Sequence, residues 1–74
     1  MPKIPPLTSR SVIRVLEKKG FVLVRTKGTH HLFRNEQTGR QVTVPIHTND
    51  LPAGTLHEIL KQAGIFRDEI LDLM

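Results

Sequence analysis

The chain has 74 residues, contains no Cys and carries a formal net charge of +4. This length suits one compact domain over residues 1–74, and the absence of Cys excludes disulfides and thiolate metal sites. No apolar run approaches the ~20 residues that a membrane-spanning helix needs, and the N-terminal segment lacks a signal-peptide core. We therefore expect a cytoplasmic protein that does not contact a membrane.

Basic residues gather in the first two-thirds of the chain. Between residues 10 and 40 only Glu17 and Glu36 are acidic, although this stretch holds most of the Lys and Arg; the last third is rich in Asp and Glu. This asymmetry favours an anionic partner for the first two-thirds. The alternative is the ordinary surface charge of a small protein.

The first predicted element is a helix. Three prolines should keep residues 2–7 extended, and either Thr8 or Ser9 can cap the helix that follows. Gly20 should end this helix, because glycine commonly follows the last helical turn. The apolar face of the helix consists of Val12, Ile13, Val15 and Leu16.

Three short strands should follow the helix. Residues rich in β-branched and aromatic side chains, or alternating with polar ones, predict strands at 21–24, about 30–34, and 41–44. Short turns at Lys27-Gly28 and at 36–39 should join these strands into an antiparallel meander. Pro45 should end the third strand or lie at a sheet edge.

The clearest helical pattern lies in the last third, where apolar residues recur at positions i, i+3, i+4 and i+7: Leu56, Ile59, Leu60 and Ala63. Thr55 with Glu58 would form a capping box. Asp50 with Pro52 in the first turn would start the helix earlier, and we favour this earlier start. Gly64 should end the helix, and a short terminal helix containing Phe66, Ile70 and Leu73 should follow.

This order predicts an α+β fold of the α-β-β-β-α type with a short C-terminal helix. A three-stranded antiparallel sheet with both main helices on one face buries both apolar stripes and leaves the other face free. It is the arrangement of the double-stranded-RNA-binding domain, but a fold alone does not assign a function.

Two adjacent histidines, His30 and His31, are the residues most informative about function. Histidine can take and give a proton near pH 7. RNA cleavage needs the 2′-hydroxyl deprotonated and the leaving 5′-oxygen protonated. Neighbouring strand residues point to opposite faces, so the pair cannot chelate one metal ion, and we expect no metal site. The alternative for His30 is a strand histidine with a local hydrogen bond.

The neighbours of His30 allow two interpretations each. Arg25 and Lys27 could contact phosphates or simply form a solvated face. Gly28 could let the backbone approach a phosphate, or could serve a turn that needs positive φ. His47 follows Pro45 in a loop that could border the same cleft.

Aromatic residues argue against a protein that binds single strands by stacking bases. The chain has no Trp or Tyr, and Phe21 and Phe33 should lie in the core. Base-stacking proteins need exposed aromatic side chains.

Several motifs together resemble the HicA family of small bacterial toxins, which are mRNA interferases. The resemblance covers residues 7–73 approximately. One residue departs from it: relatives usually place Ser or Thr at the position of Phe66 to cap the last helix, so this helix should start later, at Asp68, or fray. The matching motifs are Gly20-Phe21, Gly28-Thr29-His30, Val44-Pro45 with His47, and the glycine-bounded helix at 54–64.

The resemblance implies the toxin of a type II toxin–antitoxin system, a metal-independent endoribonuclease that uses no cofactor. It assigns catalysis to His30, since relatives need not have a histidine at the position of His31. The implied partners are messenger RNA and a HicB-like antitoxin, which would usually also bind operator DNA. Two alternatives remain: a non-catalytic RNA-binding module of the same fold, and a degenerate member that only binds the antitoxin. The candidate RNA-binding residues are Arg25, Lys27, Gly28, Thr29 and His47, which lie near His30 in the predicted strands, turn and loop.

Overall fold

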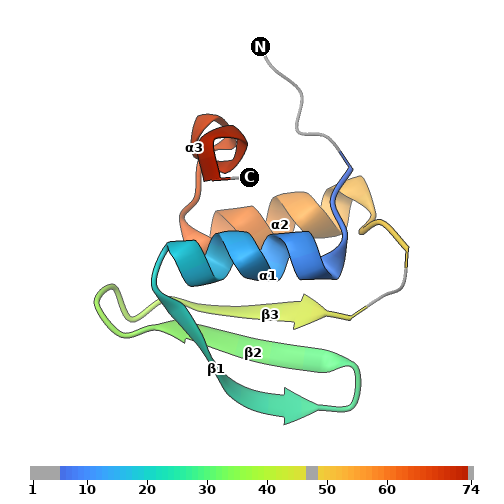
Figure 1. The fold of residues 1–74 in the computed structure, drawn as a ribbon. Helices are drawn as coiled ribbons and strands as arrows, with labels where there is room; N and C mark the ends of the chain where they lie inside the picture. Colours follow the sequence, from blue (N-terminus) through green and yellow to red (C-terminus); the bar gives the residue numbers. More distant parts are fainter. Residues whose placement is uncertain (1–5, 47–48, 74) are drawn as a thin grey trace.

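The structure is a computed structural model, and it describes residues 6–46 and 49–73. Within this part of the chain the α+β order expected from the sequence is confirmed (Figure 1). No helix found there is long and apolar enough to cross a membrane. The elements are α1 (Ser9–Lys18), β1 (Phe21–Lys27), β2 (His30–Asn35), β3 (Gln41–Pro45), α2 (Ala53–Ala63) and α3 (Arg67–Leu73).

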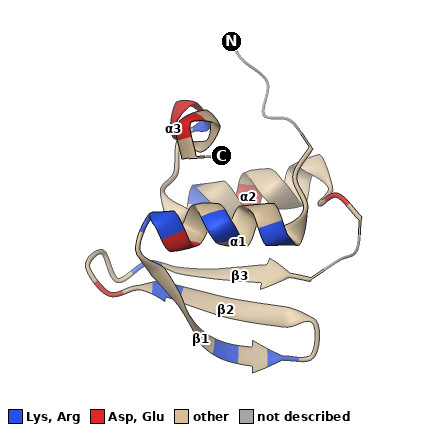
Figure 2. Cartoon of the chain, in the orientation of Figure 1, with Lys and Arg blue, Asp and Glu red and all other residues tan. Residues whose placement is uncertain are grey.

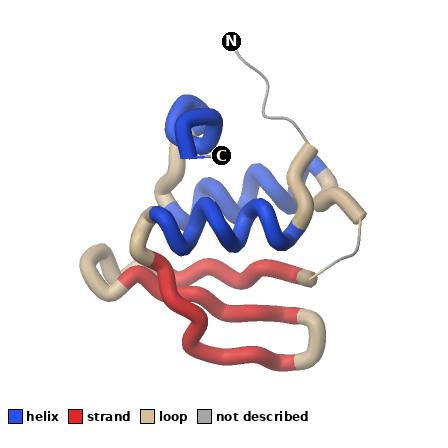
Figure 3. Tube along the Cα trace, viewed as in Figure 1, coloured by secondary structure: helices blue, strands red, loops and turns tan. Residues whose placement is uncertain are grey.

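A sheet and the helices that cover one of its faces form two layers. The strands pair antiparallel in sequence order, β1-β2-β3. Helices α1 and α2 lie side by side over the same face of the sheet, and α3 packs against α1 on the side away from the sheet (Figures 1 and 3). Among the described residues nothing covers the other face, which is the free face that the sequence predicted.

Apolar side chains from every layer fill the space between the sheet and the helices. Phe21 and Phe33 are each 3% exposed, in agreement with their predicted core positions. Phe66 differs: it lies just outside α3 and is 74% exposed. The side chains with the least exposed area are Val12, Val15, Leu16, Val42, Val44 and Ile70.

The two candidate caps of α1 have separate roles. Thr8 is the N-cap, and its Oγ1 accepts a hydrogen bond from the Ser11 amide at 3.2 Å. Ser9 is buried, and its hydroxyl donates to the carbonyl of Pro45, at the end of β3, at 2.8 Å. This hydrogen bond therefore links the start of α1 to the end of the edge strand β3.

Helix α2 starts before the Thr55 capping box, which confirms the favoured earlier start, but the predicted place of Pro52 in the first turn is wrong. Its first residue is Ala53, and Pro52 occupies the N-cap without a side-chain hydrogen bond. Asp50 lies outside the helix, where it forms an isolated bridge with Thr8.

Helix α3 starts at Arg67, so the predicted start at Asp68 is wrong by one residue. The physical reason is a cap supplied from inside the helix: Glu69 Oε1 accepts a hydrogen bond from the Phe66 amide at 3.3 Å. This is the reach-back half of a capping box, which needs no hydroxyl at the position of Phe66.

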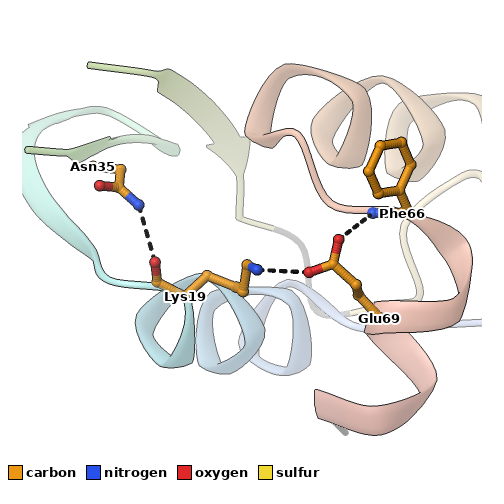
Figure 4. A network of polar contacts seen from close by, with 4 residues as sticks. All are labelled: Lys19, Asn35, Phe66 and Glu69. Atoms are coloured by element: carbon orange, nitrogen blue, oxygen red, sulfur yellow. Dashed lines mark hydrogen bonds and ion pairs between the residues drawn. The ribbon is translucent and has the colours of Figure 1, made fainter. Parts of the chain in front are cut away.

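The carboxylate of Glu69 also belongs to a polar network that joins three elements (Figure 4). Glu69 Oε2 pairs with Lys19 Nζ at 2.6 Å. The carbonyl of Lys19 accepts a hydrogen bond from Asn35 Nδ2 at 2.9 Å, and Asn35 is buried at the end of β2. The network therefore fixes the end of α1 against both the sheet and α3.

The pH dependence of stability should report on this network. The hydrogen bond from Lys19, followed by that from the Phe66 amide, holds the pKa of Glu69 below its ordinary value. A pKa lowered by folding stabilises the fold above the unfolded-state pKa, and this contribution is lost as pH falls through the folded-state pKa. Glu69→Gln should therefore reduce the free energy of unfolding at neutral pH, and the difference from wild type should shrink in acid. Urea unfolding at a series of pH values measures this; a difference that stays constant into acid would contradict it.

Candidate functional site

Strand pairing places the two adjacent histidines on opposite faces of the sheet, as predicted. His31 pairs with Val44, which is completely buried beneath the helices. Directly paired residues share a face, so the half-buried His31 lies on the covered side. His30 pairs with Pro45 and lies on the uncovered side, exposed to solvent.

Three cations share the uncovered face with His30. Lys27 lies directly opposite His30 in the β1–β2 pairing, and Cβ atoms of such pairs are about 4.5–5.5 Å apart. Arg25 pairs with Leu32, and both Leu32 and Arg34 lie an even number of residues from His30 on β2, so they face the same way. We call the set Arg25, Lys27, His30 and Arg34 the basic face; Figure 2 shows Lys and Arg over the second half of β1 and at the far end of β2.

Arg34 was not among the predicted site residues. The strand period of two would have found it, because it lies four positions after His30 on the same strand. Its Nε lies 3.9 Å from Oε1 of Glu36, and both side chains are largely exposed. An exposed pair at this distance contributes little energy, so Arg34 can exchange Glu36 for another anion.

A β-bulge brings Arg25 onto the basic face. The register shifts between Leu23 and Arg25, which leaves Val24 as an extra residue in β1. If pairing continued evenly from Leu23 opposite Phe33, Arg25 would lie opposite His31 on the covered face. Bulges often occur beside functional sites, where they redirect a side chain.

The turn before β2 fixes the position of His30. Gly28 has a φ of +58°, whereas no described non-glycine residue, Thr29 included, has positive φ. This is the pattern of a type II′ turn, whose first central position favours glycine. A Cβ on Gly28 would meet nothing within 4 Å, so conformation explains the glycine without a close neighbour. The Thr29 carbonyl accepts a hydrogen bond from the Ile46 amide at 2.7 Å, which ties the turn to the end of β3.

The geometry gathers most of the predicted site residues into one small region. Arg25, Lys27, Gly28, Thr29 and His30 all lie on the β1–β2 hairpin. His47 lies outside the described residues. Within those residues, His, Cys, Asp and Glu nowhere gather in a group that could hold a metal ion. An exposed imidazole among cations can exchange protons with an anionic ligand that lies across the strands.

A comparison with protein-family models finds a match over residues 9–65 to the family described as HicA toxin of bacterial toxin-antitoxin. The matched segment runs from the start of α1 to just beyond α2, so it covers more than half of the chain and includes the whole basic face. A comparison with curated proteins finds no match.

Proposed function

This chain belongs to the HicA toxin family, and thus to the toxins of toxin–antitoxin systems, and we propose that it is an endoribonuclease that cleaves messenger RNA in the cytoplasm. In this proposal the enzyme needs no metal ion or other cofactor. One observation carries the proposal: an exposed histidine, His30, shares the uncovered face of the sheet with Arg25, Lys27 and Arg34.

His30 supplies the acid–base chemistry in the proposed mechanism. Its imidazole takes the proton of a ribose 2′-hydroxyl, and the freed oxygen attacks the adjacent phosphorus. The bond from phosphorus to the 5′-oxygen breaks, and the His30 imidazolium gives the proton it took to that oxygen, so the products are a 2′,3′-cyclic phosphate and a 5′-hydroxyl, and the imidazole is neutral again. Lys27, directly opposite His30, stabilises the negative charge that builds up on the phosphoryl oxygens.

The rest of the basic face binds the RNA backbone in this proposal. Arg25 and Arg34 neutralise phosphates on either side of the reacting one, and binding should therefore weaken as salt rises. The exposed turn residues Gly28 and Thr29 offer backbone groups beside His30. His47 is proposed as a further contact to the RNA.

The partner in the proposal is a HicB-like antitoxin that covers the basic face. Val22 supports a protein partner there, because this large apolar side chain pairs with Arg34 on the basic face and is half exposed. Exposed apolar surface beside charged residues is typical of protein interfaces. In the family the antitoxin usually also binds operator DNA, so the toxin would meet DNA only through its partner.

Cleavage of naked RNA by the purified protein tests this function. We expect cleavage without ribosomes, at a rate that EDTA does not change, leaving 2′,3′-cyclic phosphate ends. RNA that is bound but not cleaved would instead indicate a non-catalytic RNA-binding module. A protein that neither binds nor cleaves RNA but still binds its antitoxin would be a degenerate member of the family. Activity that EDTA removes would contradict the metal-independent mechanism.

A further inference from the structure

A second basic site lies between the end of α2 and the start of α3. An open pocket of about 550 Å³ is found there. Three cations line it, Arg40, Lys61 and Arg67, together with His57 and the exposed Phe66, and no carboxylate is among its lining residues. Its charge therefore suits an anionic ligand.

This pocket is well separated from His30. The Asn35 amide at the end of β2 donates to the carbonyl of Arg40 at 2.9 Å, so Arg40 adjoins the end of the strand that His30 begins. At ~3.3 Å per strand residue, the two ends of β2 are roughly 17 Å apart. The pocket is thus a different site from the basic face.

Arg40 is held in place across the C-terminal end of α2. Its Nη1 donates to the Gln62 carbonyl at 3.3 Å. Its guanidinium also lies against Gly64, where a Cβ would come within 2.9 Å of Nε. The carbonyls of Leu60 and Lys61 accept hydrogen bonds from backbone amides that follow the helix. The last carbonyls of α2 therefore have hydrogen-bond donors, and the guanidinium of Arg40 lies where it counters the partial negative charge at this helix end.

Phe66 offers a flat apolar surface at the opening of this pocket. It is 74% exposed, whereas Phe21 and Phe33 are 3% exposed. Its backbone is anchored by the hydrogen bond to Glu69, and its ring points away from Glu69 and Lys19 (Figure 4). A ring on an anchored backbone beside cations is the combination that single-strand-binding proteins use to stack bases and hold phosphates.

We propose that this pocket binds an unpaired nucleotide of an RNA strand, whose base stacks on Phe66 and whose phosphates contact Arg40, Lys61 and Arg67. This inference rests on the proposed function, because RNA is also the ligand of the basic face. The pocket holds the strand several nucleotides away from the bond at His30. It binds with little preference for sequence, because every base has a face that can stack.

A fluorescent variant tests the proposal directly. The chain has no Trp or Tyr, so Phe66→Trp introduces a single fluorophore, and His30→Ala in the same protein prevents cleavage. An unstructured RNA oligonucleotide should quench this tryptophan, and replacing Lys61 and Arg67 by Gln should raise the concentration needed. An abasic oligonucleotide of equal length should bind without quenching. Equal quenching by the abasic strand, or none by either, would overturn the proposal.

Affinity measurements supply the matched control. In the His30→Ala background, Phe66→Ala should weaken binding of the RNA oligonucleotide about tenfold, a typical effect of losing one stacked base. Leu71→Ala removes an exposed apolar side chain from α3 itself and should change nothing. Equal effects of the two substitutions would contradict a specific stacking site. If the antitoxin shifts the tryptophan emission to the blue and RNA does not quench it, the site belongs to the protein partner and the proposal is wrong.

These results separate this site from the proposed function. If the wild type cleaves RNA and Phe66→Ala leaves both affinity and cleavage unchanged, the function stands and the stacking site is wrong. If RNA quenches the tryptophan but the wild type cleaves no RNA, the stacking site stands and the catalytic proposal is wrong.

Discussion

Replacing His30 by Ala should abolish the growth arrest caused by expressing the toxin and slow RNA cleavage by about 10²–10⁴-fold, the usual contribution of a positioned acid–base group. The fold should be unaffected, because His30 is exposed at the start of β2 and its removal leaves no cavity. His31→Ala should retain most of the activity, because the His31 side chain lies on the covered face.

Far-UV circular dichroism and thermal unfolding are the controls for this pair of variants. Both proteins should keep the wild-type spectrum, and the His30→Ala protein should also keep the wild-type melting temperature. If His31 proves essential for cleavage and His30 dispensable, the basic face is not the active site.

Binding of the antitoxin should stop RNA cleavage completely by covering the basic face. Inhibition from a distance would require a second arrangement of the packed core, and a core of this size offers little room for one. Hydrogen exchange on the free and bound toxin should show protection of the backbone amides at 27–31 and of the neighbouring residues Val22, Leu23 and Val24. In the free toxin the amides of the exposed turn residues Gly28 and Thr29, and those of the edge strand β1 that do not pair with β2, should exchange readily.

The His30→Ala protein is the control for this masking. It should bind the antitoxin about as tightly as wild type, since the exposed apolar residues of β1 and the cations of the basic face remain. Protection confined to α1 and α2, with residues 27–31 unchanged, would contradict masking and would require inhibition at a distance.

Local rules were enough to predict the fold and the orientation of the histidines. The apolar stripe at 56–63 and the glycine after it were enough to predict α2. Apolar residues with a period of 3.6 lie on one face of a helix, whereas a strand would divide them between its two faces. That His30 and His31 point to opposite faces of the sheet follows from strand geometry alone. The resemblance to HicA toxins, based on motifs in order, is confirmed by the family match.

Contacts between distant segments account for what the sequence did not reveal. The sequence of residues 21–24 predicts a regular strand, and no local feature marks Val24 as the bulged residue. The register between β1, β2 and β3 is set by the turn at Gly28-Thr29 and by the burial of Phe33 and Val44. The start of α3 depends on Glu69, whose other partner, Lys19, lies 50 positions away in the chain. The ring of Phe66 lies outside the core, just before α3 begins. The sequence could not predict this exposure, because a single apolar residue outside a periodic pattern does not show whether it is buried.

The rate at which the purified His30→Ala protein cleaves one naked RNA, relative to wild type and His31→Ala, tests the central claim most directly. RNA binding by the same samples shows whether each protein can still engage its substrate. We expect all three proteins to bind the RNA with similar affinity, and only the His30→Ala protein to leave it intact. Cleavage by the His30→Ala protein at the wild-type rate would contradict the assignment of catalysis to His30 on the basic face.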